Sequence, residues 1–334
     1  MIPAVSVDAY TAARQRAGVI DRADRARIVV SGADRASFLQ GLLTNDVVAL
    51  QPGHGCYAAY LTAQGRMIAD LYVYELGDVM LLTLHRDVKD AVIAKLDQLV
   101  FSEDVHLGDV TETFAQIALV GPLAGSIVAS IVAVPVEQLD GLADHGNLRA
   151  AWNGSPAIVT RTGDTGEPGF DLFVERTAGA ALKQALNSAG AIDVDPATAD
   201  AIRLEAGVPL FHRDMDEETI PLEAGIESRA ISFTKGCYVG QEVVIRVLHR
   251  GHGRVARKLV GLRLNGDRVP LAGAAIRSAD RDVGRVTSSA YSPALKHPIA
   301  LGYVHRDFVA PGTSLIVDGE PAEVSALPFV SNAE

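Results

Sequence analysis

Short runs of apolar, β-branched and aromatic residues, separated by polar turn residues, occupy the early part of the chain. Three such runs, CYAAYLT, RMIADLYVYEL and VMLLTLH, follow one another between residues 56 and 85, separated by the turn sequences AQG and GD. This pattern predicts an antiparallel meander. A helix is predicted next over residues 87–100, where apolar side chains recur at helical spacing.

Strands and helices continue to alternate through the middle of the chain. Strands are predicted near 148–152, 157–162 and 169–175, and helices over 178–188 and 196–207, the second one opened by Asp195-Pro196. Before the meander, the pattern predicts a helix over 8–17, a strand over 27–30 and a helix over 33–40. Mixed strands and helices in this order predict an α+β fold.

Three later stretches are less regular. Residues 208–235 are polar with little period, which indicates a functional or poorly ordered loop. Residues 239–249 fit either a strand, by their β-branched content, or a helix, by the spacing of their valines. After Lys258 the chain is rich in β-branched residues and turns, which predicts a small barrel or sandwich.

The stretch Lys235–Glu242, KGCYVGQE, carries the most distinctive chemistry. Two glycines flank the Cys-Tyr pair, so the backbone can turn tightly and approach another group. Lys235 precedes the thiol of Cys237 by two residues, and a helix starting near Val239 would direct its positive N-terminal end at the sulfur. Both effects favour a reactive thiolate. The alternative is a glycine-rich turn that buries a small residue.

Composition and charge narrow the classes of function. The chain has 334 residues, of which 48% are hydrophobic and 21% charged, as in a globular protein of two or three domains. Its net charge of −11 argues against broad binding to nucleic-acid phosphates. Apolar runs are too short for a membrane span, and the first residues lack the apolar core of a signal peptide.

The cysteine count excludes further classes of protein and site. Only Cys56 and Cys237 are present, so a disulfide scaffold is not expected and a reducing cytoplasm fits best. An iron–sulfur cluster is usually held by four cysteines, and no zinc-type spacing of cysteine or histidine occurs, so no metal site is predicted. Cys56 lies in a predicted strand and is expected to be an inert core thiol.

Six stretches in order resemble a known family. They are FLQGLLTNDV, QGRMIADLYVY, TGDTGEPGFDLFV, RLEAGVPLFHRDMDEETIPLEAG, KGCYVGQE and VGRVTSSAYSPALKHPIALGYV. Over nearly its full length the chain resembles the aminomethyltransferase (T-protein) superfamily of the glycine cleavage system. Within that superfamily it is most similar to the YgfZ-type folate-binding proteins, whose hallmark is the K-G-C-Y-x-G-Q-E octet.

The resemblance implies a three-module, aminomethyltransferase-like α+β fold with a C-terminal β-barrel. Residues 1–245 would form the folate-binding region, from two intertwined α+β modules, and residues 246–334 the barrel domain. Tetrahydrofolate or a one-carbon derivative would bind in a central channel. For the YgfZ-type branch it further implies a role in the assembly or repair of iron–sulfur enzymes, including tRNA-modifying ones, with these enzymes or their assembly proteins as partners.

Candidate site residues follow from the same resemblance. The Asp-Asp pair of aminomethyltransferases reads Ala69-Asp70 here, so the second carboxylate, which is the catalytic one in the family, is kept. A single carboxylate can still hydrogen-bond a reduced pterin or transfer a proton. Asp70 is therefore expected to be catalytic and to bind the cofactor, and Cys237 is the second catalytic candidate.

Further cofactor-binding candidates match the family less closely. The tyrosine of the Tyr-Thr-Gly-Glu segment is replaced by Asp164, and Asp171 stands where the family has a glutamate that pairs the aminopyrimidine edge of the pterin. A two-oxygen acceptor suits the adjacent N–H donors of that edge. Glu205 matches a family signature and is expected to be more structural than ligand-binding. The octet adds Lys235 and Tyr238.

Three functions therefore remain open. The first is a tetrahydrofolate-binding accessory factor for iron–sulfur enzymes that uses Cys237 at the mouth of the channel and is not a turnover enzyme. The second is a tetrahydrofolate-dependent aminomethyltransferase of the glycine cleavage system that uses Asp70. The third is a folate-responsive binding module without turnover. The sequence places the first ahead because of the octet, Ala69 and Asp164.

Overall fold

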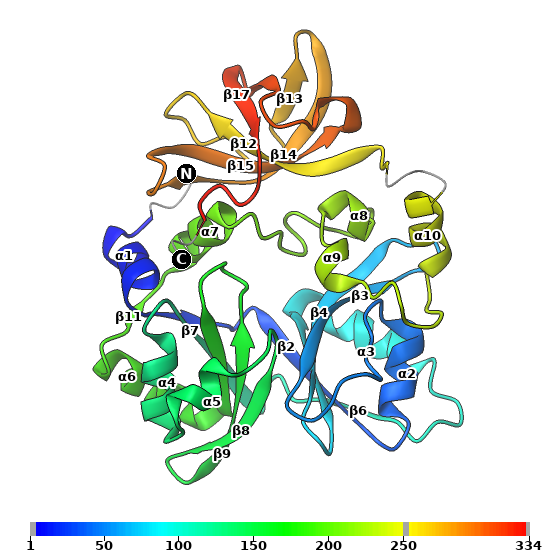
Figure 1. The fold of residues 1–334 in the computed structure, drawn as a ribbon, viewed down its shortest axis with the longest axis vertical. Helices are drawn as coiled ribbons and strands as arrows, with labels where there is room; N and C mark the ends of the chain where they lie inside the picture. Colours follow the sequence, from blue (N-terminus) through cyan, green and yellow to red (C-terminus); the bar gives the residue numbers. More distant parts are fainter. Residues whose placement is uncertain (1–4, 250–253, 332–334) are drawn as a thin grey trace.

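The computed structural model describes residues 5–249 and 254–331. Two modules of mixed helices and strands lie side by side, and a β-barrel lies above them in the view of Figure 1, with short helices between. This arrangement confirms the α+β class and the C-terminal barrel expected from the sequence. No helix within these residues is long and apolar enough to cross a bilayer.

The first module is a five-stranded sheet with the strand order β3-β4-β5-β2-β6. Its strands are β2 (Arg25–Ser31), β3 (Gly55–Leu61), β4 (Met67–Glu75), β5 (Met80–His85) and β6 (His106–Asp109), and its helices are α2 (Arg35–Leu42) and α3 (Lys89–Asp97). The meander β3-β4-β5 is antiparallel, as the sequence predicts. Because side chains alternate along a strand, Asp70 and Tyr72 share one face of β4, and Tyr57 on β3 pairs with Tyr72.

The second module is a six-stranded sheet with the strand order β11-β1-β7-β10-β9-β8. Its strands are β1 (Gly18–Asp21), β7 (Phe114–Val120), β8 (Asn147–Trp152), β9 (Ser155–Thr162), β10 (Gly169–Glu175) and β11 (Ile192–Asp193), and its helices are α4 (Ala124–Val132), α5 (Val136–Asp140) and α6 (Gly179–Ser188). Strand β1 belongs to this sheet and β2 to the other, so the chain crosses between the modules at residues 22–24.

The barrel is closed by six strands in the order β12-β15-β14-β13-β16-β17. They are β12 (Arg257–Leu264), β13 (Ala275–Ser278), β14 (Arg281–Ser292), β15 (His297–His305), β16 (Ser314–Val317) and β17 (Glu320–Ser325). Helices α1 (Val7–Gln15) and α7 (Pro196–Glu205) lie below it in Figure 1, and α7 packs on β14 and β15. Helix α7 begins as predicted, because the side chain of Asp195 accepts a hydrogen bond from the Thr198 backbone N–H.

Residues 208–235 are better organised than their polar pattern indicates. They contain the short helices α8 (Pro221–Ala224) and α9 (Glu227–Ala230). Their apolar side chains are irregularly spaced yet buried in the core of the first module: Phe211, Met215, Leu222, Ile226 and Ala230. This burial comes from tertiary contacts, which a local period does not reveal.

The ambiguous stretch 239–249 forms helix α10 (Gln241–His249). The helix begins two residues later than expected because Gly240 adopts a φ of +85°, in the left-handed region. A Cβ atom on Gly240 would lie 2.6 Å from the carbonyl oxygen of Thr62, so only glycine allows this close approach. Helix α10 also spans positions 245 and 246, where the sequence analysis placed the domain boundary.

Candidate functional site

A cavity of about 490 Å³ lies where the two modules meet α7, α9 and residues 208–213, and we call it the central cavity. Side chains from many separate segments line it. Arg22 and Arg25 come from the β1–β2 crossing, and Asp70 and Tyr72 from β4. The other polar residues of the lining are Asp21, Asp24, Tyr57, Asp164, Thr165, Asp200, Arg203, Arg213 and Arg229. Its size is typical of a small-molecule site.

Asp70 is buried in the wall of the central cavity, with 6% of its surface exposed. Its Oδ2 accepts a hydrogen bond from the Tyr57 hydroxyl at 2.8 Å. Its Oδ1 is buried and has no hydrogen-bond partner in the described part of the chain. Burial raises the pKa of this carboxyl above its ordinary value, although Arg25 and the Tyr57 hydroxyl oppose the rise. Asp70 is therefore poised to hold or accept a proton.

Asp164, which replaces the tyrosine of the family, also lines the cavity. Arg25 donates a hydrogen bond to it at 3.0 Å, Tyr72 donates a second one, and Arg22 lies at 3.7 Å. Burial opposes the ionised form, but Arg25 and Arg22 outweigh burial and hold the pKa of Asp164 below its ordinary value. Asp164 is therefore held ionised, whereas Asp70 readily takes up a proton. The lining also contains the carboxylates of Asp21, Asp24 and Asp200.

Asp171 does not line the central cavity. It lies on β10 behind Arg22, whose Nε is 3.5 Å from Oδ1, and its Oδ2 accepts a hydrogen bond from Gln116 at 3.0 Å. Burial raises the pKa of Asp171, because only part of its charge is compensated by Arg22. Asp171 therefore supports Arg22 from behind the lining, and the acids of this module that line the cavity are Asp164 and Asp21. Cofactor binding by Asp171 stays a prediction.

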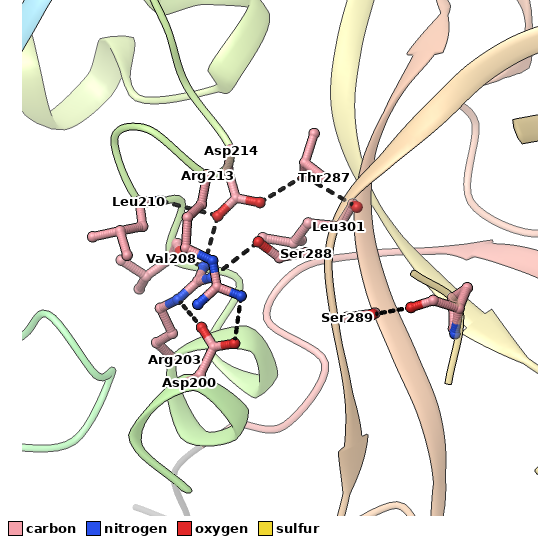
Figure 2. A network of polar contacts seen from close by, with 11 residues as sticks. Asp200, Arg203, Val208, Leu210, Arg213, Asp214, Thr287, Ser288, Ser289 and Leu301 are labelled. Carbon is pink, nitrogen blue, oxygen red and sulfur yellow. Dashed lines mark hydrogen bonds and ion pairs between the residues drawn. The ribbon is translucent and has the colours of Figure 1, made fainter. Parts of the chain in front are cut away.

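One side of the central cavity is held in place by the network of Figure 2. Arg203 on α7 donates hydrogen bonds to Asp200, to Asp214 and to the barrel residue Ser288, at 2.7, 2.7 and 3.0 Å. Asp200 also accepts a hydrogen bond from Arg213 at 2.9 Å. These bonds tie α7 and the following loop to the barrel, so this wall is rigid without a ligand.

Glu205 lies outside the central cavity and is fully buried. Its carboxylate accepts hydrogen bonds from Tyr10 and Arg14 on α1 and from Ser292 on β14. Its backbone carbonyl accepts further bonds from Phe329 and Val330. Glu205 therefore joins α1, α7 and the barrel. These contacts fit the structural role that the sequence analysis expected of Glu205 more than a role in cofactor binding.

Lys235 and Tyr238 also lie outside the lining of the cavity. The Lys235 ammonium donates hydrogen bonds to the carbonyl oxygens of Gln40, Leu43 and Asn45, at 2.6, 2.7 and 2.9 Å, and so caps the C-terminal end of α2. Burial lowers its pKa to about 8. The ammonium also lies 5.0 Å from the centre of the Tyr238 ring. Both residues fix the octet to the first module, and neither lines the central cavity. Their expected role in cofactor binding stays a prediction.

The two cysteines differ in exposure. Cys237 is exposed and does not line the central cavity, so the structure does not bring it together with Asp70. Cys56 is buried in the core of the first module, and burial raises the pKa of its thiol to about 12. An inert core thiol at Cys56 is consistent with this environment.

Sequence reasoning missed the cationic and aromatic part of the site. Arg22 and Arg25 flank the crossing between the modules, and Arg229 lies over the Tyr57 ring at 5.5 Å. The Tyr57 and Tyr72 rings lie 5.1 Å apart and form an aromatic wall. The alternation of β4 placed Tyr72 on the same face as Asp70, and this signal was readable from the sequence. The positions of the arginines depend on how the modules meet.

Comparisons with known proteins cover almost the whole chain. Residues 3–235 match the GCVT N-terminal domain family, and residues 257–331 match the glycine cleavage T-protein C-terminal barrel domain family. The chain is similar to the glycine cleavage system aminomethyltransferase T from Bartonella henselae, with a TM-score of 0.88 and 25% sequence identity over 98% of this chain and 90% of the other.

The curated relatives similar to this chain include named aminomethyltransferases. The aminomethyltransferase of Streptomyces coelicolor is 34% identical over 96% of this chain and 88% of its own length. The aminomethyltransferase of Cutibacterium acnes is 35% identical over 92% of this chain and 85% of its own length. These names contradict the first function expected from the sequence, an accessory factor for iron–sulfur enzymes. They favour the second, an aminomethyltransferase.

Proposed function

Because the chain belongs to the family defined by the GCVT N-terminal domain and the glycine cleavage T-protein C-terminal barrel domain, we propose that it is a tetrahydrofolate-dependent aminomethyltransferase. The central cavity is the proposed site. The observation that carries the proposal is Asp70, a buried carboxylate with a raised pKa and one oxygen without a hydrogen-bond partner in the described residues. Such a group is costly to keep unless a ligand or a reaction uses it.

The central cavity suits a reduced pterin in size and chemistry. Its volume of about 490 Å³ falls in the range of small-molecule sites. Tyr57 and Tyr72 offer an aromatic wall for a flat heterocycle. The carboxylate oxygens of Asp164 keep lone pairs beyond those used by Arg25 and Tyr72, and these can accept hydrogen bonds from an aminopyrimidine edge. This acid takes the place that the sequence analysis gave to Asp171.

Tetrahydrofolate would supply the nitrogen nucleophile that receives the one-carbon unit. Asp70 would accept the proton of that nitrogen at Oδ1, the oxygen that has no internal partner. Tyr57 holds the other oxygen and so fixes the direction in which Oδ1 points. The raised pKa strengthens Asp70 as a base, because a carboxylate of higher pKa takes a proton more readily. Arg22 and Arg25 keep Asp164 ionised, so the two acids serve different roles.

We also propose that the chain belongs to the YgfZ-type branch of this family, on the strength of the KGCYVGQE octet alone. The octet is anchored by Lys235 to α2 and by Gly240 against Thr62, away from the lining of the central cavity. Aminomethyl transfer should therefore not depend on the Cys237 thiol. A Cys237→Ser variant that loses transfer activity would overturn this separation.

The test is a calorimetric titration with tetrahydrofolate, followed by an assay of aminomethyl transfer from a lipoyl-bound donor. Wild type is expected to bind in the micromolar range and to turn over. Asp164→Asn should weaken binding about tenfold or more, because it removes a charged acceptor. Asp70→Asn should bind but transfer about 10²–10⁴ times more slowly. Asp280→Asn, an exposed turn residue of the barrel, is the control.

Two outcomes would count against the proposal. Absence of tetrahydrofolate binding would remove the cavity as its site. Binding without transfer would favour the third function expected from the sequence, a folate-responsive module without turnover. Loss of the first aspartate of the family pair, at Ala69, is the sequence feature that such an outcome would implicate.

A further inference from the structure

Arg27 on β2 is a buried cation with an unusual environment. Only 2% of its surface is exposed. Its guanidinium donates hydrogen bonds to the Thr111 carbonyl at 2.7 Å and to the Gln116 side-chain oxygen at 3.3 Å, and both acceptors are neutral. Its Nε has no hydrogen-bond partner, and it forms no ion pair, within residues 5–249 and 254–331. Buried arginines are normally paired with an anion, because an unpaired buried charge is costly.

Arg27 lines a second cavity, of about 360 Å³, on the other side of residues 21–23 from the central cavity. We call it the arginine cavity. Its other cations each pair with a carboxylate: Arg22 with Asp164 and Asp171, Arg86 and Arg176 with Glu112, and Lys183 with Asp193. Asp21 is the acid in its lining. The positive charge of this wall contrasts with the net charge of −11 of the whole chain.

The N-terminal end of α6 faces the same cavity. Gly179 and Ala180, its first two residues, are part of the lining. The first turn of α6 contains no acidic residue, and no side chain caps its N-terminus within the described chain. The backbone N–H of Gly179 donates a hydrogen bond to the Arg176 carbonyl, so α6 continues the turn of residues 176–178. What α6 offers the cavity is the positive end of its dipole, which attracts anions. Gly179 also lets the helix approach β7 closely, because a Cβ there would lie 2.7 Å from that of Ala115.

We propose that the arginine cavity binds a phosphate-type dianion, as free phosphate or as a phosphate monoester. Two features converge on this ligand. Arg27 is buried and forms no ion pair within the described residues, and the cations Arg86, Arg176 and Lys183 line the same cavity. The positive end of α6 lies in the same lining. Guanidinium groups bind phosphate oxygens with two parallel hydrogen bonds, and helix N-termini supply further donors. The anion supplies a directly paired counter-charge, which no carboxylate of the described residues gives Arg27.

Arg27 is already oriented for this role. Thr111 and Gln116 fix its guanidinium, and the Gln116 amide in turn donates to Asp171, which lies against Arg22. Little side-chain freedom is therefore lost when an anion binds, and preorganisation of this kind favours affinity. The site does not include Asp70 or Asp164, although the two cavities share Asp21, Arg22 and Ala23 in their linings.

The proposal is tested by calorimetric titration of the full chain with inorganic phosphate at low ionic strength. Wild type is expected to bind one phosphate with an affinity that falls as salt is added. The double variant Arg86→Gln, Lys183→Gln should bind about tenfold or more weakly, because it removes two cations at the rim. Arg277→Gln is the matched control, since Arg277 is an exposed barrel arginine paired with Asp282. Arg27→Gln, if it folds, should abolish binding.

Titration with glycerol 2-phosphate separates the two sources of the anion. Tighter binding of the monoester than of inorganic phosphate would identify an organic phosphate as the ligand, and equal binding would identify free phosphate. Absence of saturable heat with both compounds would overturn the proposal. Equal affinity in wild type and in the double variant would overturn it as well, because the bound phosphate would then lie elsewhere.

Discussion

Replacement of Asp70 by asparagine should make the protein more stable at neutral pH and nearly inactive. Oδ1 of Asp70 is a buried acceptor without a partner in the part of the chain that the structure describes, and its charge is only partly balanced by Arg25. An unsatisfied buried polar group costs about 1–3 kcal/mol, and more when it is charged. Asparagine keeps an acceptor for the Tyr57 hydroxyl and removes the charge, while its amide NH2 group is as unpaired as Oδ1, so the gain comes from the charge alone. We therefore expect a gain of about 1–3 kcal/mol in the free energy of unfolding.

The sign of the pH dependence follows from the raised pKa of Asp70. Between the ordinary carboxyl pKa of about 3.9 and the raised folded value, the folded protein holds a proton that the unfolded chain has released. In that window the stability of the wild type falls as pH rises. Above the folded pKa the cost of the buried charge is fully present, and below about pH 3.9 it is absent. The advantage of Asp70→Asn should therefore be largest at neutral pH and should vanish in acid.

The assay is urea unfolding of wild type, Asp70→Asn and the exposed control Asp280→Asn at neutral pH and at the lowest pH where all three fold. Aminomethyl transfer by the same samples provides the second readout. A loss of activity by about 10²–10⁴ together with a gain in stability fits a catalytic carboxylate kept at a cost in stability. An Asp70→Asn variant that is less stable than wild type at neutral pH would refute the reasoning, because the charge would then be well compensated.

Three further predictions concern other parts of the molecule. Glu205→Ala should lower the free energy of unfolding by about 3–5 kcal/mol, because it breaks a buried ion pair that joins α1, α7 and the barrel. Urea unfolding measures this loss, and a loss below about 1 kcal/mol would contradict the structural role of Glu205. Gly240→Ala should destabilise the chain by about 2 kcal/mol more than Gly225→Ala. Both glycines have a positive φ, but a Cβ on Gly240 would also clash with the backbone oxygen of Thr62. Equal losses of unfolding free energy in the two variants would rule out this clash. At pH 8 the native protein should react rapidly with one equivalent of a disulfide reagent, because Cys237 is exposed and burial raises the thiol pKa of Cys56 to about 12. Rapid reaction of a Cys237→Ser variant would disprove this assignment of the reactive thiol to Cys237.

Strand and helix order was largely decided by local patterns. The meander of β3, β4 and β5 follows from apolar runs divided by turn residues, and the proline-started helix α7 follows from its cap. Both signals depend on neighbouring residues only. Family motifs also identified Asp70 as a site residue, and the alternation of β4 placed Tyr72 beside it. Such signals survive in the sequence because each one spans only a few positions.

Other features depended on contacts between distant residues. Residues 208–235 show no period, and the first module nevertheless buries their apolar side chains. Residues 239–249 fitted both strand and helix, and the left-handed turn at Gly240 against Thr62 decided for the helix. The octet predicted a cofactor role for Lys235 and Tyr238, whereas the ammonium of Lys235 caps α2, a contact made across almost 200 positions of sequence.

The sequence by itself therefore determined the fold class and the barrel, because local period and short motifs encode them. It also predicted Asp70 as a site residue, and the structure places Asp70 in the wall of the central cavity. Only the tertiary structure decided which charged groups meet. It placed Asp164 rather than Asp171 at the central cavity, and it left Arg27 buried without a carboxylate in the described residues. The physical reason is that burial and pairing of charges arise where separate elements pack together, and the electrostatic cost that marks a site appears only after that packing.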